Sequence, residues 1–96
     1  MPDSIAKRFK QYDILSLIGE GGIGQVFLAH DQKLGRKVAL KFLPEHLNRD
    51  PRHRERFLRE ARAAAALDHP FICKIFEAGE FQGRACIVME FVEAET

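Results

Sequence analysis

The stretches Gly19-Glu20-Gly21-Gly22-Ile23-Gly24-Gln25-Val26 and Val38-Ala39-Leu40-Lys41 decide the fold of this chain. The glycines at 19, 21 and 24 lack a Cβ, so backbone N–H groups can approach an anion closely and positive φ angles cost little. Lys41 adds a positive charge after a short separation in sequence. Together the two stretches predict a phosphate-binding loop followed by a strand that carries a lysine.

Three kinds of glycine-rich loop share this spacing, and the residues after the loop separate them. A dinucleotide-binding loop opens a helix, whereas a P-loop ends in Gly-Lys followed by Ser or Thr. Gly24-Gln25-Val26 excludes the P-loop. Residues 25–29 include β-branched and aromatic side chains and no helix-capping residue, so they predict a strand. The third kind, a loop between two strands, remains.

The two stretches resemble the start of a protein kinase domain, whose signature is G-x-G-x-x-G-x-V followed by a V-A-I-K strand. Residues 19–26 match every fixed position, and residues 38–41 differ only in having Leu40 in place of isoleucine. Residues 22–24, 34–41 and 88–92 are similar to bacterial serine/threonine kinases of the eukaryotic-like type. The resemblance implies an α+β fold, the kinase N-terminal lobe, with a five-stranded antiparallel sheet and one regulatory helix between strands three and four.

The length of 96 residues suits one small domain but is far short of a complete kinase. We expect an N-terminal extension over 1–11, the lobe over 12–92, and the start of a linker to a second lobe over 93–96. The 96 residues contain neither the catalytic His-Arg-Asp nor the metal-binding Asp-Phe-Gly. This chain by itself is therefore not expected to transfer phosphate.

Composition and charge favour an ordinary soluble domain. The net charge of +1 is too small to create a positive potential that attracts nucleic acid, so nucleic acid is not expected as a partner. The chain has no apolar run long enough to cross a bilayer and no signal peptide, so a cytoplasmic location is expected, with a membrane anchor beyond Thr96 left open. Cys73 and Cys86 lack the CxxC spacing and are expected to be buried free thiols, and no metal site is expected.

The coarse pattern of the chain predicts the order of its elements. Asp31 and Gly35 suit a turn between strands two and three, and Gln82-Gly83 suits a hairpin turn between strands four and five. Asp50 suits the N-cap of a helix that Pro51 begins. Five strands are expected over 12–18, 25–30, 37–43, 72–81 and 84–91, and a helix over 50–67.

The periodicity of these elements brings Lys41 and Glu60 together. Ala39 and Lys41 lie on the same face of their strand because side chains alternate. On the helix, Glu60 falls beside the apolar stripe of Phe57, Ala61, Ala64 and Leu67, so it is expected to point inward and to need a cation. By resemblance, Lys41 is that cation, in the kinase pair between strand and helix. The alternative is a solvated Glu60 that pairs locally with Arg56.

The resemblance also implies which residues bind ATP, with Mg²⁺ held by ligands in the missing second lobe. Lys41 and Glu60 are the expected catalytic residues. Val26 and Ala39 would enclose the adenine ring, Met89 would guard the back of the pocket, and backbone groups of Glu90 and Val92 would bind adenine. The nucleotide-binding positions are Ile18, Gly19, Glu20, Gly21, Gly22, Ile23, Gly24, Gln25, Val26, Ala39, Lys41, Met89, Glu90 and Val92.

The expected function is therefore that of the ATP-binding lobe of a serine/threonine protein kinase, whose full-length form phosphorylates protein substrates. The alternative is a stand-alone, non-catalytic kinase-like module that binds or regulates a partner. The arginines of the predicted helix are expected to form a solvated face, although an acidic partner remains an alternative. Self-association of the isolated lobe is expected, because Met89, Phe91 and Val92 form apolar surface that a second lobe would cover.

Overall fold

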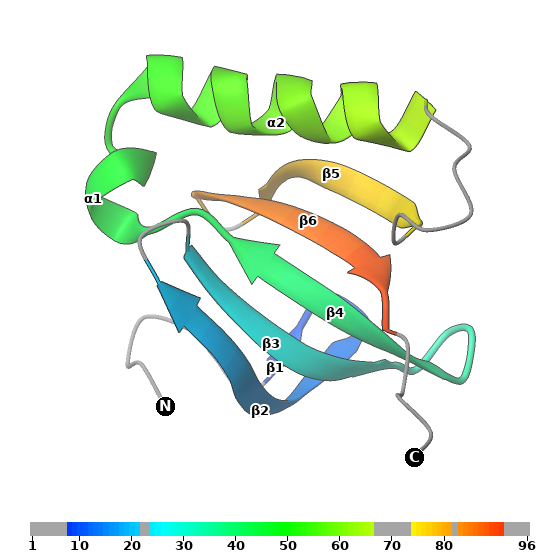
Figure 1. The fold of residues 1–96 in the computed structure, drawn as a ribbon. Coiled ribbons are helices and arrows are strands. Elements are labelled where there is room, and N and C mark those ends of the chain that lie inside the picture. The colour runs from blue at the N-terminus through cyan, green and yellow to red at the C-terminus, as the bar shows by residue number, and fades with distance from the viewer. Residues whose placement is uncertain (1–7, 22–23, 67–73, 82, 92–96) are drawn as a thin grey trace.

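The computed structural model describes residues 8–21, 24–66, 74–81 and 83–91, with the side chains of 64–66 left out. Within these residues the chain forms six strands and two helices (Figure 1). The strands are β1 (Arg8–Phe9), β2 (Tyr12–Gly21), β3 (Gly24–Asp31), β4 (Arg36–Phe42), β5 (Ile75–Phe81) and β6 (Arg84–Glu90). The helices are α1 (Glu45–Asn48) and α2 (Pro51–Ala66).

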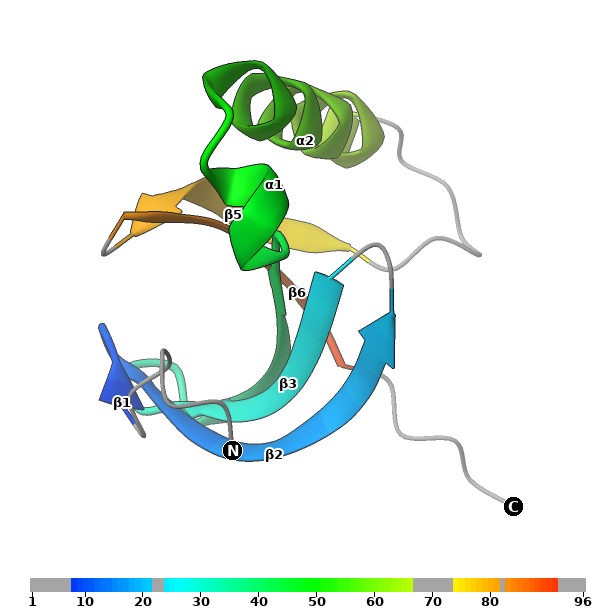
Figure 2. The same cartoon turned by 90° about the vertical axis from the view of Figure 1, so that its left-hand side faces the viewer.

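The strands form one antiparallel sheet in the order β1-β2-β3-β4-β6-β5. Figure 2 shows that this sheet curls strongly, so that β1 and β2 lie below and β5 and β6 lie above a common interior. Helix α2 lies along the outer side of β5 and β6, and α1 leads into it from the end of β4. The molecule therefore has two packed regions, one inside the curl and one beneath α2.

The interior of the curl holds the larger core. Phe27, Phe42 and Leu40 are fully buried there, together with Val38, Val88 and Cys86. Aromatic rings meet edge to face, with 5.9 Å between the ring centroids of Phe27 and Phe42. The electrostatic quadrupoles of the rings favour this arrangement. The second region is smaller and consists of Leu43, Leu58 and Ala85 with flanking apolar side chains from α1, α2 and β5. It fixes α2 on the sheet.

Strand β1 closes the curl from the opposite edge. Phe9 is only 3% exposed and its ring packs edge to face on Phe42 and on Phe81 of β5, at 5.4 and 5.5 Å between centroids. Lys10 Nζ lies 3.0 Å from Glu77 Oε1 and 4.0 Å from the centroid of Phe81. We call this group of Phe9, Lys10, Glu77 and Phe81 the N-terminal latch. It joins the two edges of the sheet through side chains.

Tyr12 supports the N-terminal latch from β2. Its hydroxyl donates to Glu77 Oε2 at 3.1 Å, and burial together with this carboxylate raises the pKa of the phenol above its ordinary value. Residues 8 and 9 therefore pair and pack with the strands that follow them. Phe9 belongs to the main core, and β1 makes the sheet six-stranded rather than five-stranded.

The other expected elements are present with shifted ends. The five expected strands correspond to β2–β6, and the expected helix between strands three and four is α2, which begins at Pro51. The short helix α1 was not expected, because four residues carry no readable periodicity. Cys86 is a buried free thiol whose pKa burial raises to about 12, whereas Cys73 lies outside the described residues. None of the helices in the described ranges is long and apolar enough to cross a membrane.

Candidate functional site

The sheet register gathers the expected nucleotide-binding side chains on one face. Val26 of β3 lies opposite Lys41 of β4, and Ala39 lies opposite Met89 of β6. Directly paired residues share a face, and so do residues two apart on one strand, so these four side chains project from the same side. Ala39 is 6% exposed, and the other three are half-buried. The structure thus forms a small apolar surface with Lys41 at one end.

The glycine loop is the tip of the β2–β3 hairpin. Pairing continues through Glu20 with Gln25 and Gly21 with Gly24, while Gly22 and Ile23 lie outside the described residues. A strand follows the loop, as expected, which agrees with the exclusion of a helix-opening dinucleotide loop. The loop therefore joins β2 to β3, and β3 is the strand that carries Val26.

Gly19 keeps the surface above Val26 open. A Cβ at Gly19 would lie 3.7 Å from Val26 Cβ, in ordinary contact. The absence of a side chain there leaves room for a flat ligand against Val26, whose own side chain is half-buried. Ile18, the preceding residue, is 47% exposed and adds apolar surface at the same end of β2.

Gly24 has a structural role that the sequence did not reveal. Its φ is +128°, and a Cβ there would lie 2.2 Å from the carbonyl oxygen of Phe42, which is far inside any allowed contact. The close approach occurs where the start of β3 passes the end of β4. Glycine at this position is therefore required by the backbone itself, independently of any phosphate.

Lys41 and Glu60 line one groove but do not form the expected ion pair. The groove, of about 340 Å³, lies between β4 and the helices and is lined by Lys41, Leu43, Leu47, His53, Arg56, Phe57 and Glu60. Glu60 Oε1 instead contacts Arg56 Nε at 3.3 Å, and the two side chains are 69% and 73% exposed. The expectation that Glu60 points inward is wrong for this structure, and the local pair with Arg56 is the arrangement found.

The orientation of α2 explains this difference. Leu58 and Ala61 are 8% and 4% exposed and face the sheet, where Leu58 packs in the cluster with Leu43 and Ala85. Leu58 precedes Glu60 by two residues, which is about 200° around a helix, so burying Leu58 turns Glu60 to the flank. The expected stripe left out Leu58. Of that stripe, the Ala64 side chain and Leu67 lie outside what the structure describes.

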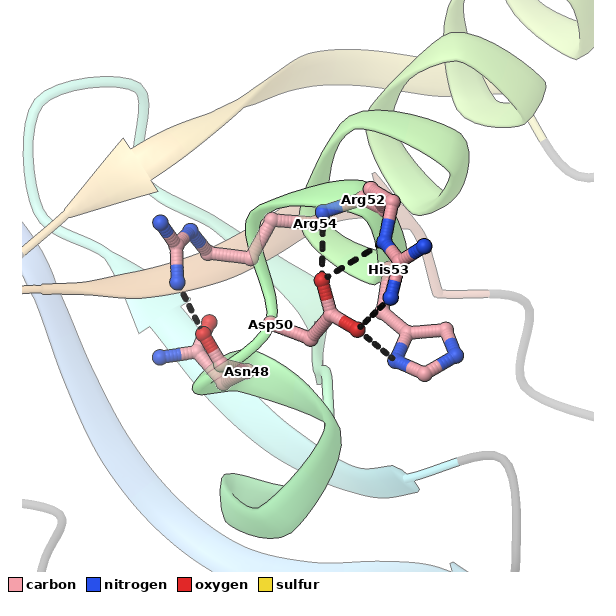
Figure 3. A network of polar contacts seen from close by, with 5 residues as sticks. All are labelled: Asn48, Asp50, Arg52, His53 and Arg54. Carbon is pink, nitrogen blue, oxygen red and sulfur yellow. Dashed lines mark hydrogen bonds and ion pairs between the residues drawn. The ribbon is translucent and has the colours of Figure 1, made fainter.

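The N-terminal end of α2 is held by a polar network (Figure 3). Asp50 Oδ1 accepts a hydrogen bond from the backbone N–H of Arg52 at 2.9 Å, so Asp50 caps the helix as expected. Hydrogen bonds from the Arg52 backbone and side chain lower the pKa of the Asp50 carboxyl. His53 Nδ1 lies 3.6 Å from Asp50 Oδ2, and Arg54 donates to the carbonyl oxygen of Asn48. The start of α2 is therefore tied to α1.

Asn48 connects this network to the sheet, a role not expected from the sequence. Its side chain is nearly buried, donates to the carbonyl of Gly83 at 2.7 Å and accepts from the N–H of Ala85 at 3.0 Å. These are backbone groups of the β5–β6 hairpin. The only sequence signal was a lone asparagine among charged residues, which is typical of a helix end.

The far end of β6 carries the remaining expected residues. Met89 faces the site, and Glu90 is exposed with its N–H donating to the carbonyl of Lys74 at 2.7 Å. That N–H is therefore already occupied, whereas Val92 lies outside the described residues. In the described part of the chain, no three His, Cys, Asp or Glu side chains are grouped to hold a metal ion.

Comparisons with known proteins identify relatives of this chain. The family model described as protein kinase domain matches residues 12–96. The chain is 44% identical over 97 residues to serine/threonine-protein kinase pkn2 of Myxococcus xanthus, covering 99% of this chain and 11% of that protein. It is 47% identical over 85 residues to serine/threonine-protein kinase PknJ of Mycobacterium tuberculosis, covering 88% of this chain and 14% of that protein.

A solved structure has a similar fold. The crystal structure of the Mycobacterium tuberculosis PknI kinase domain aligns with 90% of this chain at a TM-score of 0.74 and 34% sequence identity. The alignment covers 35% of that domain. The chain is thus similar to one part of a kinase domain and spans a small share of the length of these relatives.

Proposed function

The chain belongs to the protein kinase family, and we propose that it is the ATP-binding lobe of a serine/threonine kinase that phosphorylates protein hydroxyls when full-length. The observation that carries this proposal is the shared face of Val26, Ala39 and Lys41 beside the glycine hairpin. The apolar surface can hold the ring of a nucleoside triphosphate. The nearby cation and the backbone N–H groups of the glycine hairpin can bind its phosphates.

In this proposal each part of the face has its own role. Val26 and Ala39 contact the adenine ring, and Met89 limits the depth of the pocket. Backbone N–H groups of the glycine hairpin bind the phosphate oxygens, and Lys41 neutralises the α- and β-phosphates. When bound, ATP supplies the phosphoryl group that the full-length enzyme transfers. Glu60 orients Lys41 in states where the helix brings the two together.

The 96 residues alone are proposed to be inactive in phosphate transfer. They contain no His-Arg-Asp and no Asp-Phe-Gly, so a catalytic base and the Mg²⁺ ligands must come from elsewhere in the full-length protein. The isolated lobe also encloses a nucleotide from one side only. We therefore propose weak ATP binding by the chain, with self-association through the apolar surface near Met89 and Phe91.

The decisive test is calorimetric titration of the chain with ATP and magnesium, accompanied by sedimentation at several concentrations. Lys41→Met should weaken ATP binding, because an apolar side chain cannot neutralise phosphate oxygens. Lys33→Met removes the same charge from the exposed β3–β4 turn and serves as the matched control. Equal loss in both variants would mean that only net charge matters, and the assignment of Lys41 would be wrong.

The same substitution tests the enzyme. In the full-length protein, Lys41→Met should abolish most phosphoryl transfer while the fold survives, and unchanged turnover would refute the role of Lys41. The reading frame beyond Thr96 separates the kinase from a non-catalytic module, because only the kinase requires downstream His-Arg-Asp and Asp-Phe-Gly motifs.

A further inference from the structure

The groove between β4 and α2 is lined by one carboxylate and by two cations that come from different elements. Glu60 lies on α2, Arg56 lies one turn earlier on the same helix, and Lys41 comes from the sheet. We propose that Arg56 is a positioning residue that competes with Lys41 for Glu60 and so opposes the catalytic pair. The inference rests on the proposed function, since it concerns the regulation of that same site.

The competition follows from where the two cations are attached. Arg56 and Glu60 are four residues apart on one helix, so their contact at 3.3 Å is available wherever α2 lies on the sheet. Contact between Lys41 and Glu60 requires a particular helix orientation, and the present one, with Leu58 buried, does not provide it. Arg56 therefore contacts Glu60 in the orientation in which Lys41 does not.

Closing the pair between Lys41 and Glu60 would disturb Arg56 in either of two ways. If Glu60 leaves Arg56, the helical ion pair is lost. If Arg56 follows Glu60, two positive charges are brought together in one groove, which is unfavourable. The other basic side chain of the groove, His53, contacts Asp50 at 3.6 Å and is directed to the helix cap (Figure 3). Arg56 is thus the helix cation that contacts Glu60.

The expected effect is modest because the groove is open to solvent. Both members of the Arg56–Glu60 pair are mostly exposed, and a pair of this kind on a helix shifts an equilibrium by about twofold. Removal of Arg56 should therefore raise the population of the Lys41–Glu60 contact by about twofold. This makes Arg56 a means of adjusting the site rather than an absolute block.

Acylation of lysines in the chain, followed by mass spectrometry, measures this contact directly. With Lys33 as the internal reference, Arg56→Ala should reduce the labelling rate of Lys41 by up to about twofold, because Glu60 then covers the amine in a larger share of the molecules. Adding Glu60→Gln to that variant should restore the rate, and Arg56→Lys should behave as the parent chain does. Arg59→Ala removes a charge from the same helix. Because the Arg59 side chain lines a different groove, on the side toward β5, this substitution should not change the labelling rate of Lys41.

Unchanged Lys41 labelling in Arg56→Ala, or an equal change in Arg59→Ala, would overturn the inference. The ATP titration separates this failure from failure of the proposed function. If the chain binds ATP through Lys41 but Lys41 labelling does not respond to Arg56→Ala, only the proposed competition between Arg56 and Lys41 is refuted. If Lys41 labelling responds to Arg56→Ala but the chain binds no ATP, the competition is supported and the proposed nucleotide binding is refuted.

Discussion

Replacement of Gly24 by alanine should cost the chain much of its stability, whereas the same replacement at Gly19 should not. Both glycines belong to the same signature and both substitutions add one methyl group. At Gly24 that methyl would lie 2.2 Å from the Phe42 carbonyl oxygen with φ at +128°, whereas at Gly19 its nearest neighbour would be 3.7 Å away. Comparing Gly24→Ala with Gly19→Ala therefore distinguishes a glycine that the backbone conformation requires from one that leaves space for the ligand.

The size of the effect follows from two contributions. Holding a residue with a side chain in a sparsely populated backbone region costs about 1–3 kcal/mol, and forcing an extra carbon into packed structure costs about 1–3 kcal/mol. Their sum of roughly 2–6 kcal/mol is large beside the roughly 5–15 kcal/mol that stabilises a small domain. In a domain of this length each kcal/mol lowers the melting temperature by about 4–8 °C, so Gly24→Ala should melt at least about 8 °C below the parent.

Thermal unfolding followed by circular dichroism tests this prediction. Gly19→Ala should melt close to the parent temperature, since its methyl makes ordinary contacts and slightly restricts the unfolded chain. It should nevertheless weaken ATP binding, because the methyl occupies the open surface above Val26. If the two variants melted at the same temperature, the close approach of β3 and β4 at Phe42 would not be what requires Gly24.

Two further predictions concern the core. Phe9→Ala should destabilise the chain by about 3–5 kcal/mol, as expected for a buried aromatic ring, whereas Leu15→Ala at an exposed site of β2 should change urea unfolding little. Burial raises the pKa of the Cys86 thiol to about 12, while an unfolded thiol ionises near about 8.5. The free energy of unfolding should therefore fall as the pH rises above that lower value, and Cys86→Ala should lose this part of the pH dependence.

The sequence predicted the strands well because their signal is local. Val38 to Phe42 alternate between the two faces, and Asp31 with Gly35 marks the hairpin before them, with Asp31 Oδ1 accepting from the N–H groups of Lys33 and Leu34. The shared face of Ala39 and Lys41 needed nothing beyond this alternation. The hairpin tip, by contrast, was only partly predictable. The need for glycine at Gly24 depends on a carbonyl 18 residues later, which no local pattern can show.

The failures arose where distant packing overrides local patterns. Strand β1 has two residues, too few for any alternation, and Phe9 is recognisable as core only once Phe42 and Phe81 are seen around it. For α2, several apolar stripes were compatible with the sequence. The contact of Leu58 with Leu43 and Ala85 selects one of them, and Glu60 then lies at the flank. Whether Glu60 faces Lys41 is thus decided by helix rotation rather than by spacing.

The N-terminal latch has a consequence for synthesis of the protein. Lys10 and Glu77 are 67 residues apart, yet their contact joins the two edges of the sheet. A ribosome releases Phe9 and Lys10 first, whereas Glu77 and Phe81, their partners in the N-terminal latch, emerge only near the end of the lobe. Contacts between such distant residues form slowly and leave apolar surface exposed in the meantime. Nascent chains that end before residue 77 should therefore present Phe9 to chaperones.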